Sequence, residues 1–152
     1  MGTRLKDFAT QVVAVVEPET TALVVAQTMR RDHVGALVVV DALDKTRPVG
    51  IVTDRDLVLE LMAEGLGAAV FTAGDIMSVD LVLAHPDMDA MDAAQLMSTH
   101  GLRRLVITDE EGRLAGIVTL EDVLDLLARE LLNLSASLAN ARQREQRQRP
   151  SA

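Results

Sequence analysis

Short apolar runs alternate along this chain with segments of helical spacing. The runs "VVAVV" and "ALVVV" are rich in β-branched residues and are followed by Pro18 and Asp41, which is typical of strands. Between them, apolar residues recur every three or four positions over 20–31, which places them on one face of a helix. The beginning of the chain therefore predicts a strand, a helix and a second strand.

The same order of elements occurs twice. A shift of 68 positions aligns residues 7–41 with 75–109, and from Gly50 onward the shift is 66. In the second copy, the corresponding strands are "VDLVLAHP", "RLVITD" and "AGIVT", and the first helix covers about 88–99. Each copy ends in another helix, which begins at Asp54 or Leu120, and the expected N-caps of the first helices are Thr20 and Asp87. Two successive β-α-β-β-α units predict an α/β fold whose halves share one core.

The last helix is predicted to continue well beyond the second copy. Its apolar residues alternate at spacings of four and three, which is the a/d seam of a coiled coil over about three heptads. The seam consists of Leu120, Leu124, Leu127, Leu131, Leu134, Leu138 and Ala141. We expect a homodimer with these helices at or beside the interface, because an exposed apolar stripe needs a partner. Packing of the helix on its own chain remains the alternative.

Composition and charge narrow the classes of function. The net charge of −8 argues against a nucleic-acid binder. The chain has no cysteine, which excludes disulfides, thiolate metal sites and cysteine catalysis. No apolar run approaches the roughly 18 residues that a membrane span needs. We therefore expect a cytoplasmic protein with no nucleic-acid or membrane partner.

Catalytic and metal-binding patterns are not recognisable in the sequence. His33, His85 and His100 form no compact ligand set. No nucleophile with a base and an orienting group is evident, and neither a P-loop nor a dinucleotide-binding glycine motif occurs. We expect neither an enzyme nor a resident metal or cofactor.

The heptapeptides "GIVTDRD" at 50–56 and "GIVTLED" at 116–122 are nearly identical. In each, Thr and the Asp three positions later can form a capping box at the start of a helix. Two features favour a binding role instead: capping boxes prefer Glu or Gln, and the leading glycine leaves the backbone open to a ligand. A hydroxyl and a carboxylate at a helix N-terminus suit the adjacent hydroxyls of a ribose. Both interpretations stay open.

The duplicated pattern resembles a pair of cystathionine β-synthase (CBS) domains, also called a Bateman module. The stretches that carry the resemblance are "DHVGALVVVD…PVGIVTDRDL" and "THGLRRLVITDEEGRLAGIVTLEDVL", with "KDFAT" and "GDIMS" as matching leading segments. The resemblance implies two halves packed with pseudo-two-fold symmetry and two clefts between them. The expected organisation is 5–65 and 73–128 for the two domains, 129–141 for a C-terminal helix extension, and 142–152 for a basic, disordered tail.

The resemblance also assigns residues to the two clefts. In members that bind adenosine derivatives, the segment from the glycine to the Asp holds the ribose, and each cleft takes its other wall from the opposite half. The first cleft would contain Ile51 beside adenine, Thr53 and Asp56 on the ribose, and Leu102, Arg103 and Arg104 on the opposite wall. The second cleft would contain Ile117, Thr119 and Asp122, faced by Val34, Gly35 and Ala36. Thr10 and Ser78 are weaker candidates near the base.

The two copies differ where "VGA" aligns with "LRR". Two guanidinium groups beside a ribose site can hold a phosphate, which makes the first cleft the better phosphoryl binder. The alternative is that both arginines are solvated surface charges. Asp54 and Glu121 could ligate magnesium only as a companion of a bound nucleotide, and solvated helix N-terminal acids explain them equally well.

These observations lead to two hypotheses of function. In the first, the chain is a regulatory module that binds AMP, ADP, ATP or a related molecule such as NAD or S-adenosylmethionine. Binding would shift the conformation that an unidentified protein partner reads. In the second, the chain is a structural or interaction module that dimerises through its helices, and its clefts are vestigial.

Overall fold

The computed structural model describes residues 2–148 and contains two three-stranded sheets. In the first sheet β1 (Val15–Val16) is parallel to β2 (Ala36–Val40), which is antiparallel to β3 (Pro48–Thr53). The second sheet repeats this order with β4 (Leu83–Ala84), β5 (Arg104–Thr108) and β6 (Leu114–Thr119). The predicted duplication is therefore present in three dimensions.

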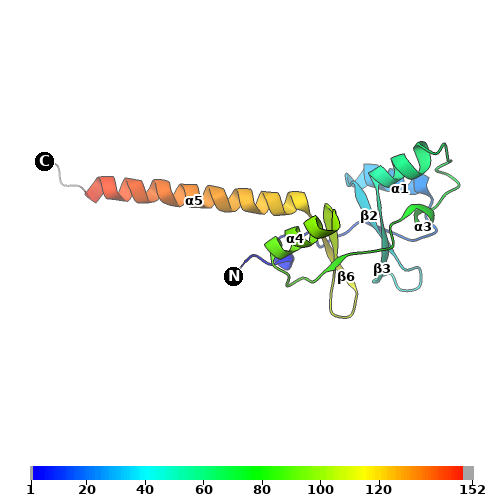
Figure 1. Cartoon of the computed structure of the whole chain (residues 1–152), viewed down its shortest axis with the longest axis horizontal. Coiled ribbons are helices and arrows are strands. Elements are labelled where there is room, and N and C mark those ends of the chain that lie inside the picture. Colours follow the sequence, from blue (N-terminus) through cyan, green and yellow to red (C-terminus); the bar gives the residue numbers. More distant parts are fainter. Residues whose placement is uncertain (1, 149–152) are drawn as a thin grey trace.

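Each sheet is accompanied by helices of its own copy (Figure 1). The first helices are α1 (Ala22–Asp32) and α4 (Ala90–His100). The closing helix of the first copy begins as α2 (Asp54–Asp56) and continues as the π-helix η2 (Leu57–Met62), whereas that of the second copy is α5 (Leu120–Gln148). Two short helices, η1 (Leu5–Asp7) and α3 (Ala73–Ile76), precede the copies. The predicted β-α-β-β-α order is confirmed in both halves.

The predicted N-caps of α1 and α4 were one and two residues too early. Thr21 caps α1, because its hydroxyl accepts a hydrogen bond from the Val24 N–H, and Asp89 caps α4 in the same way. Thr20 instead accepts a bond from the Glu17 N–H in the preceding turn. Asp87 forms an ion pair with Lys6. Both predicted residues thus stabilise the approach to the helix rather than its first turn.

The core has three parts, and the middle one joins the halves. In β2, Leu37 and Val39 pack toward α1, while Val38 and Val40 face a central cluster that also contains Val106 of β5. This arrangement buries β2 and β5 on both faces. The strands β3 and β6 have alternating burial instead. The two sheets therefore pack on each other through their inner strands.

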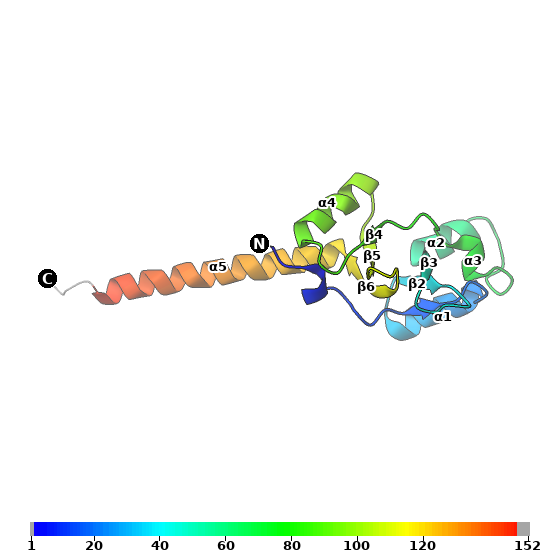
Figure 2. The ribbon, with the colours of Figure 1, turned by 90° about the horizontal axis from the view of Figure 1, so that it is seen from below.

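The segments that precede each copy are exchanged between the halves. We call residues 5–10 and 73–78 the leading segments. Leu5 is fully buried in the core of the second half, and Ala73 is fully buried in that of the first. Figure 2 shows the N-terminal segment beside the start of α5, and α3 near β3 and α1. Each half therefore completes its core with residues that come from outside its own sheet and helices.

Reciprocal backbone hydrogen bonds fix this exchange. Thr10 and Ile117 bond through both their N–H and C=O groups, at 3.1 and 2.9 Å. Ile51 and Ser78 form the equivalent pair at 3.0 and 2.9 Å. One bridge joins the first leading segment to β6, and the other joins the second leading segment to β3. The two bridges are related by the pseudo-two-fold symmetry of the halves.

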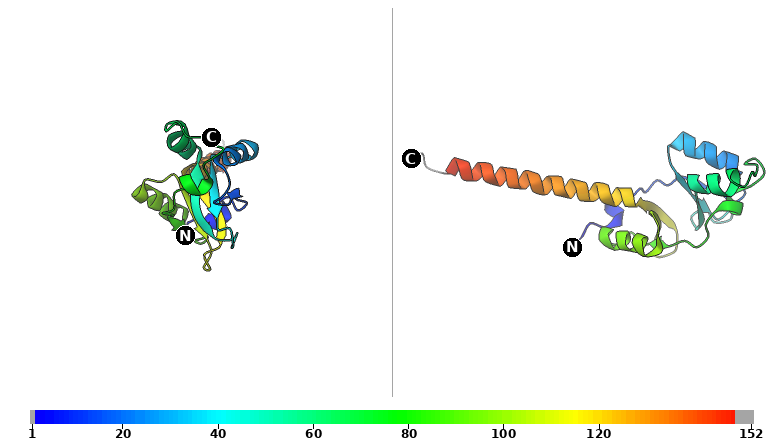
Figure 3. Two further views of the ribbon diagram at one scale, coloured as in Figure 1. Left: turned by 90° about the vertical axis from the view of Figure 1, so that its right-hand side faces the viewer. Right: turned by 45° about the horizontal axis from the view of Figure 1, so that its top comes forward.

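Helix α5 leaves the globular part soon after its first turns (Figures 1 and 3). Val123 is buried in the second half, whereas the seam from Leu124 to Leu138 is exposed. The alternative of a helix packed back on its own chain is therefore wrong. The tail prediction is wrong for 142–148, which are helical, and its last part, 149–152, lies outside the described residues. Among residues 2–148, no helix is both long and apolar enough to span a membrane.

Candidate functional site

The first cleft is a cavity of about 300 Å³ between the two halves. Its floor and one wall come from β3 and the start of α2, and its other wall comes from the segment before β5. The structure brings together the six candidates expected here, Ile51, Thr53, Asp56, Leu102, Arg103 and Arg104, and it adds Ser78, which had been assigned to neither cleft. A volume near 300 Å³ falls at the lower end of the usual range for small-molecule sites.

The second cleft occupies the related position and measures about 220 Å³. It contains the other seven candidates, Thr10, Val34, Gly35, Ala36, Ile117, Thr119 and Asp122. Arg104 reaches this cleft as well, so that it lines both cavities. The clefts are therefore unequal in volume, and one guanidinium lies between them.

The repeated Thr and Asp form complete capping boxes. The Asp56 carboxylate accepts a hydrogen bond from the Thr53 N–H at 2.8 Å, and the Thr53 hydroxyl accepts one from the Asp56 N–H at 3.2 Å. Thr119 and Asp122 make the same two bonds at 2.8 and 3.1 Å. The argument that a short Asp disfavours the box was wrong, because Asp reaches the cap N–H in both copies. In both carboxylates Oδ2 makes this bond, and Oδ1 accepts no hydrogen bond from described residues.

The two leading glycines do not open the backbone to a ligand, which corrects the second part of that argument. A Cβ at Gly50 would collide with Met77 and lie 3.1 Å from the Ser78 carbonyl oxygen. A Cβ at Gly116 would lie 2.8 Å from the carbonyl oxygen of Thr10. Both glycines therefore make room for the exchanged leading segments, which cross β3 and β6 at these points.

The two arginines of the first cleft are in different electrostatic situations. Arg103 forms an ion pair with Glu121 at 2.7 Å, and both side chains are largely exposed. A hydrogen bond from its own backbone N–H lowers the pKa of the Glu121 carboxyl, and Arg103 lowers it further. In the described part of the chain, Arg104 makes no ion pair. Arg104 is thus the cation with more freedom to meet an anion.

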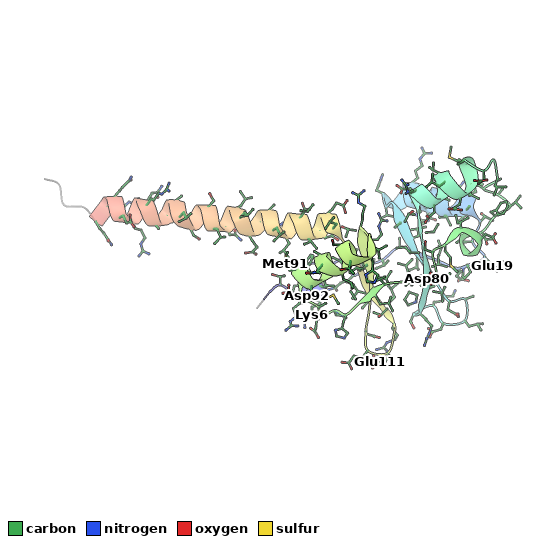
Figure 4. The ribbon with its side chains drawn as sticks, viewed as in Figure 1. Lys6, Glu19, Asp80, Met91, Asp92 and Glu111 are labelled. Carbon is green, nitrogen blue, oxygen red and sulfur yellow. The ribbon has the colours of Figure 1, made fainter. Side chains whose placement is uncertain are left out.

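Several residues of the first cleft were not among the predicted candidates. Arg55 and Asp80 add charge to it, as does Asp54, which the sequence had indicated only as a companion ligand of magnesium, and Leu81 and Val82 add apolar surface. Asp80, labelled in Figure 4, belongs to the segment that joins the two halves. The 68-residue shift aligns Leu81 and Val82 with residues 13 and 14, which line the second cleft, but the sequence had indicated neither pair as cleft residues.

The three histidines lie apart and have local roles. His33 ends α1 in the left-handed conformation, with a φ of 55°. His85 accepts a hydrogen bond from the Asp87 N–H, and His100 contacts the Leu96 carbonyl. Over residues 2–148, no cluster of three or more His, Asp or Glu side chains could hold a metal ion.

Comparison with known proteins agrees with this architecture. Residues 5–63 and 73–129 match the model of the CBS domain. An uncharacterized protein of Methanopyrus kandleri, MK0525, is 39% identical over 109 residues, which cover 72% of this chain and 55% of that protein. The CBS domain-containing protein YhcV of Bacillus subtilis is 38% identical over 135 residues, covering 89% of this chain and 91% of the relative.

A solved structure gives a ligand for one relative. The crystal structure of CBSX2 in complex with AMP has a TM-score of 0.70 at 28% identity, and the match covers 84% of this chain and 98% of that one. The repeat, the two clefts and the family match lead to the same conclusion: this chain belongs to the CBS domain family and contains a tandem pair of CBS domains.

Proposed function

We propose that this chain is a regulatory module that binds an adenosine phosphate, with AMP as the simplest case, in the first cleft. The observation that carries the proposal is the composition of that cavity. A hydroxyl and a carboxylate at a helix N-terminus share it with two guanidinium groups from the opposite half. These groups suit a ribose and a phosphate respectively. CBSX2, which is related in fold and sequence, binds AMP.

In the proposed complex the capping box and the ribose use different atoms of Asp56. Its Oδ2 holds the Thr53 N–H, and its Oδ1 remains available to a ribose hydroxyl. The adenine lies against aliphatic surface from Ile51, Leu81 and Val82, because the cleft has no aromatic side chain. Arg104, supported by Arg103, neutralises the phosphate. A bound magnesium ion is required by none of these contacts.

The proposed signal follows from the origin of the two cleft walls. The ribose groups belong to the first half, and the arginines precede and begin β5 of the second half. A ligand that contacts both walls binds one relative placement of the halves better than others, and so shifts the population toward it. The chain would therefore act by binding, without catalysis, on a protein partner that recognises that placement.

Calorimetric titration with AMP and with adenosine tests this proposal. We expect the Arg103→Ala, Arg104→Ala double variant to lose AMP affinity by about 10-fold or more and to keep its adenosine affinity, since a charged hydrogen bond contributes roughly 1.5–3 kcal/mol. The matched control is Arg113→Ala, which removes an exposed arginine of the hairpin between β5 and β6. Equal losses for both ligands, or no binding of either by the wild type, would refute the proposal.

A further inference from the structure

Helix α5 presents a continuous apolar stripe that no other described element covers. The side chains of Leu131, Leu134 and Leu138 are 67%, 63% and 62% exposed. Figure 4 shows this part of α5 extending away from the globular body, with its side chains on all sides of the helix. Leu124 and Leu127 extend the stripe toward that body, and Ala141 extends it toward the C-terminus. A stripe at a/d spacing on a free helix is suited to another helix of the same kind.

We propose that α5 pairs with α5 of a second copy of this chain in antiparallel orientation. One register places each exposed seam residue from Leu124 to Ala141 opposite another seam residue, while Leu120, which packs on the core of its own chain, lies outside the pairing. In this register Leu131 lies opposite Leu134 of the second copy, Leu127 opposite Leu138, and Leu124 opposite Ala141. Each of these pairs then combines an a position of one helix with a d position of the other. The pairing is independent of what the clefts bind.

The charge distribution along α5 selects the antiparallel orientation. Residues 121–130 contain four acidic residues and one arginine, whereas residues 142–148 contain three arginines and one glutamate. In the antiparallel pair, the basic end of each helix lies beside the acidic end of the other. Glu121 and Arg142 of the second copy both occupy e positions, which lie near each other across the seam in the stated register. A parallel pair would place acid beside acid and arginine beside arginine, which is unfavourable.

The globular parts favour the same orientation. Residues 1–119 contain 18 acidic and 10 basic residues, so each body carries a strong negative charge. A parallel pair would bring two such bodies together at one end. The antiparallel pair separates them along the length of the helices, which at about 1.5 Å per residue is on the order of 40 Å for the 29 residues of α5. It also brings the arginines at the end of each helix near the acidic body of the other copy.

Disulfide crosslinking distinguishes the two orientations, and the absence of native cysteine makes the background clean. We expect a mixture of the Leu127→Cys and Leu138→Cys variants to form a covalent dimer on oxidation, while neither variant does so alone. In the antiparallel pair the two copies of position 127 are offset by 11 residues, about 16 Å, which is beyond disulfide reach. Crosslinking of each variant with itself would establish a parallel pair and overturn the proposal.

Light scattering of the whole chain tests whether a second copy is the partner at all. We expect a dimer at micromolar concentration for the wild type and a substantial loss of dimer for Leu131→Glu, Leu134→Glu. The matched control, Asn133→Glu, Ala136→Glu, adds the same charges on the opposite side of α5 and should remain dimeric. A monomeric wild type would overturn the proposal and assign the stripe to another protein. A Leu131, Leu134 double variant that stays fully dimeric would place the dimer interface elsewhere.

Discussion

The two clefts are built on the same backbone elements, which we call the frame, and differ in the side chains of the wall that faces these elements. Both have a Thr-x-x-Asp capping box at a helix start and a leading segment that crosses the neighbouring strand. The facing walls are Leu-Arg-Arg for the first cleft and Val-Gly-Ala for the second. In addition, Asp80 in the first cleft corresponds to Val12 in the second. The frame is thus explained by folding alone, and evidence for a ligand has to come from the walls.

The largest expected effect is on AMP affinity, and it distinguishes the folding role of a capping box from a role in ligand binding. Asp56→Ala and Asp122→Ala each remove the same cap bond, so both should lower the free energy of unfolding by about 1 kcal/mol. Only Asp56→Ala should also weaken AMP binding, by about 10- to 100-fold, because it removes a charged acceptor from the ribose. Calorimetry and thermal denaturation of both variants check this. Similar changes of AMP affinity in the two variants would contradict the assignment of AMP to the first cleft.

Replacing the glycine at which a leading segment crosses a strand should lower the free energy of unfolding by different amounts in the two halves. Gly116→Ala places a methyl group against the backbone carbonyl of Thr10, which is fixed by its own hydrogen bonds. We expect it to lower the free energy of unfolding by about 1–3 kcal/mol. Gly50→Ala mainly meets the flexible Met77 side chain and should cost less. Urea denaturation of both variants measures the difference, and a reversed order would contradict the explanation given for these glycines.

The two arginines of the first cleft should contribute unequally to AMP binding. Arg104→Ala should weaken it by about 10-fold, because within residues 2–148 no acid pairs with this guanidinium. Arg103→Ala should weaken it by only about threefold, since Glu121 already pairs with Arg103 and both are largely exposed. Adenosine affinity serves as the internal control for each variant. A larger effect of Arg103 would mean that its ion pair opens when the phosphate binds.

The smallest expected effect concerns Asp80. Asp80→Asn removes a negative charge from the first cleft, where the second cleft has Val12. AMP affinity should rise by about two- to threefold at low salt and hardly at high salt, because exposed charges are screened. Titrations at two ionic strengths measure this, with adenosine as the uncharged comparison. A loss of AMP affinity would show that the carboxylate accepts a hydrogen bond from the ligand.

Local patterns in the sequence predicted the elements, whereas only part of the lining of the clefts was predicted. The period of the repeat identified the strands and helices, and the family resemblance carried the cleft residues to positions that the structure brings together. The exchange of the leading segments was not predictable in this way. The apolar character of Leu5 and Ala73 predicts only that they are buried. Because both halves have the same pattern, the sequence does not indicate in which of the two cores each residue lies. The pair formed by Arg103 and Glu121 likewise depends on how β5 and α5 meet, which side-chain spacing does not encode.

The exchange of the leading segments has a consequence for how such a chain arises. During synthesis the first half lacks Ala73 and its neighbours until well after Met62 has been made, and Leu5 waits much longer for its place in the second half. Because both leading segments belong to the same chain, each reaches the other half within one molecule, and completion of the two cores does not depend on protein concentration.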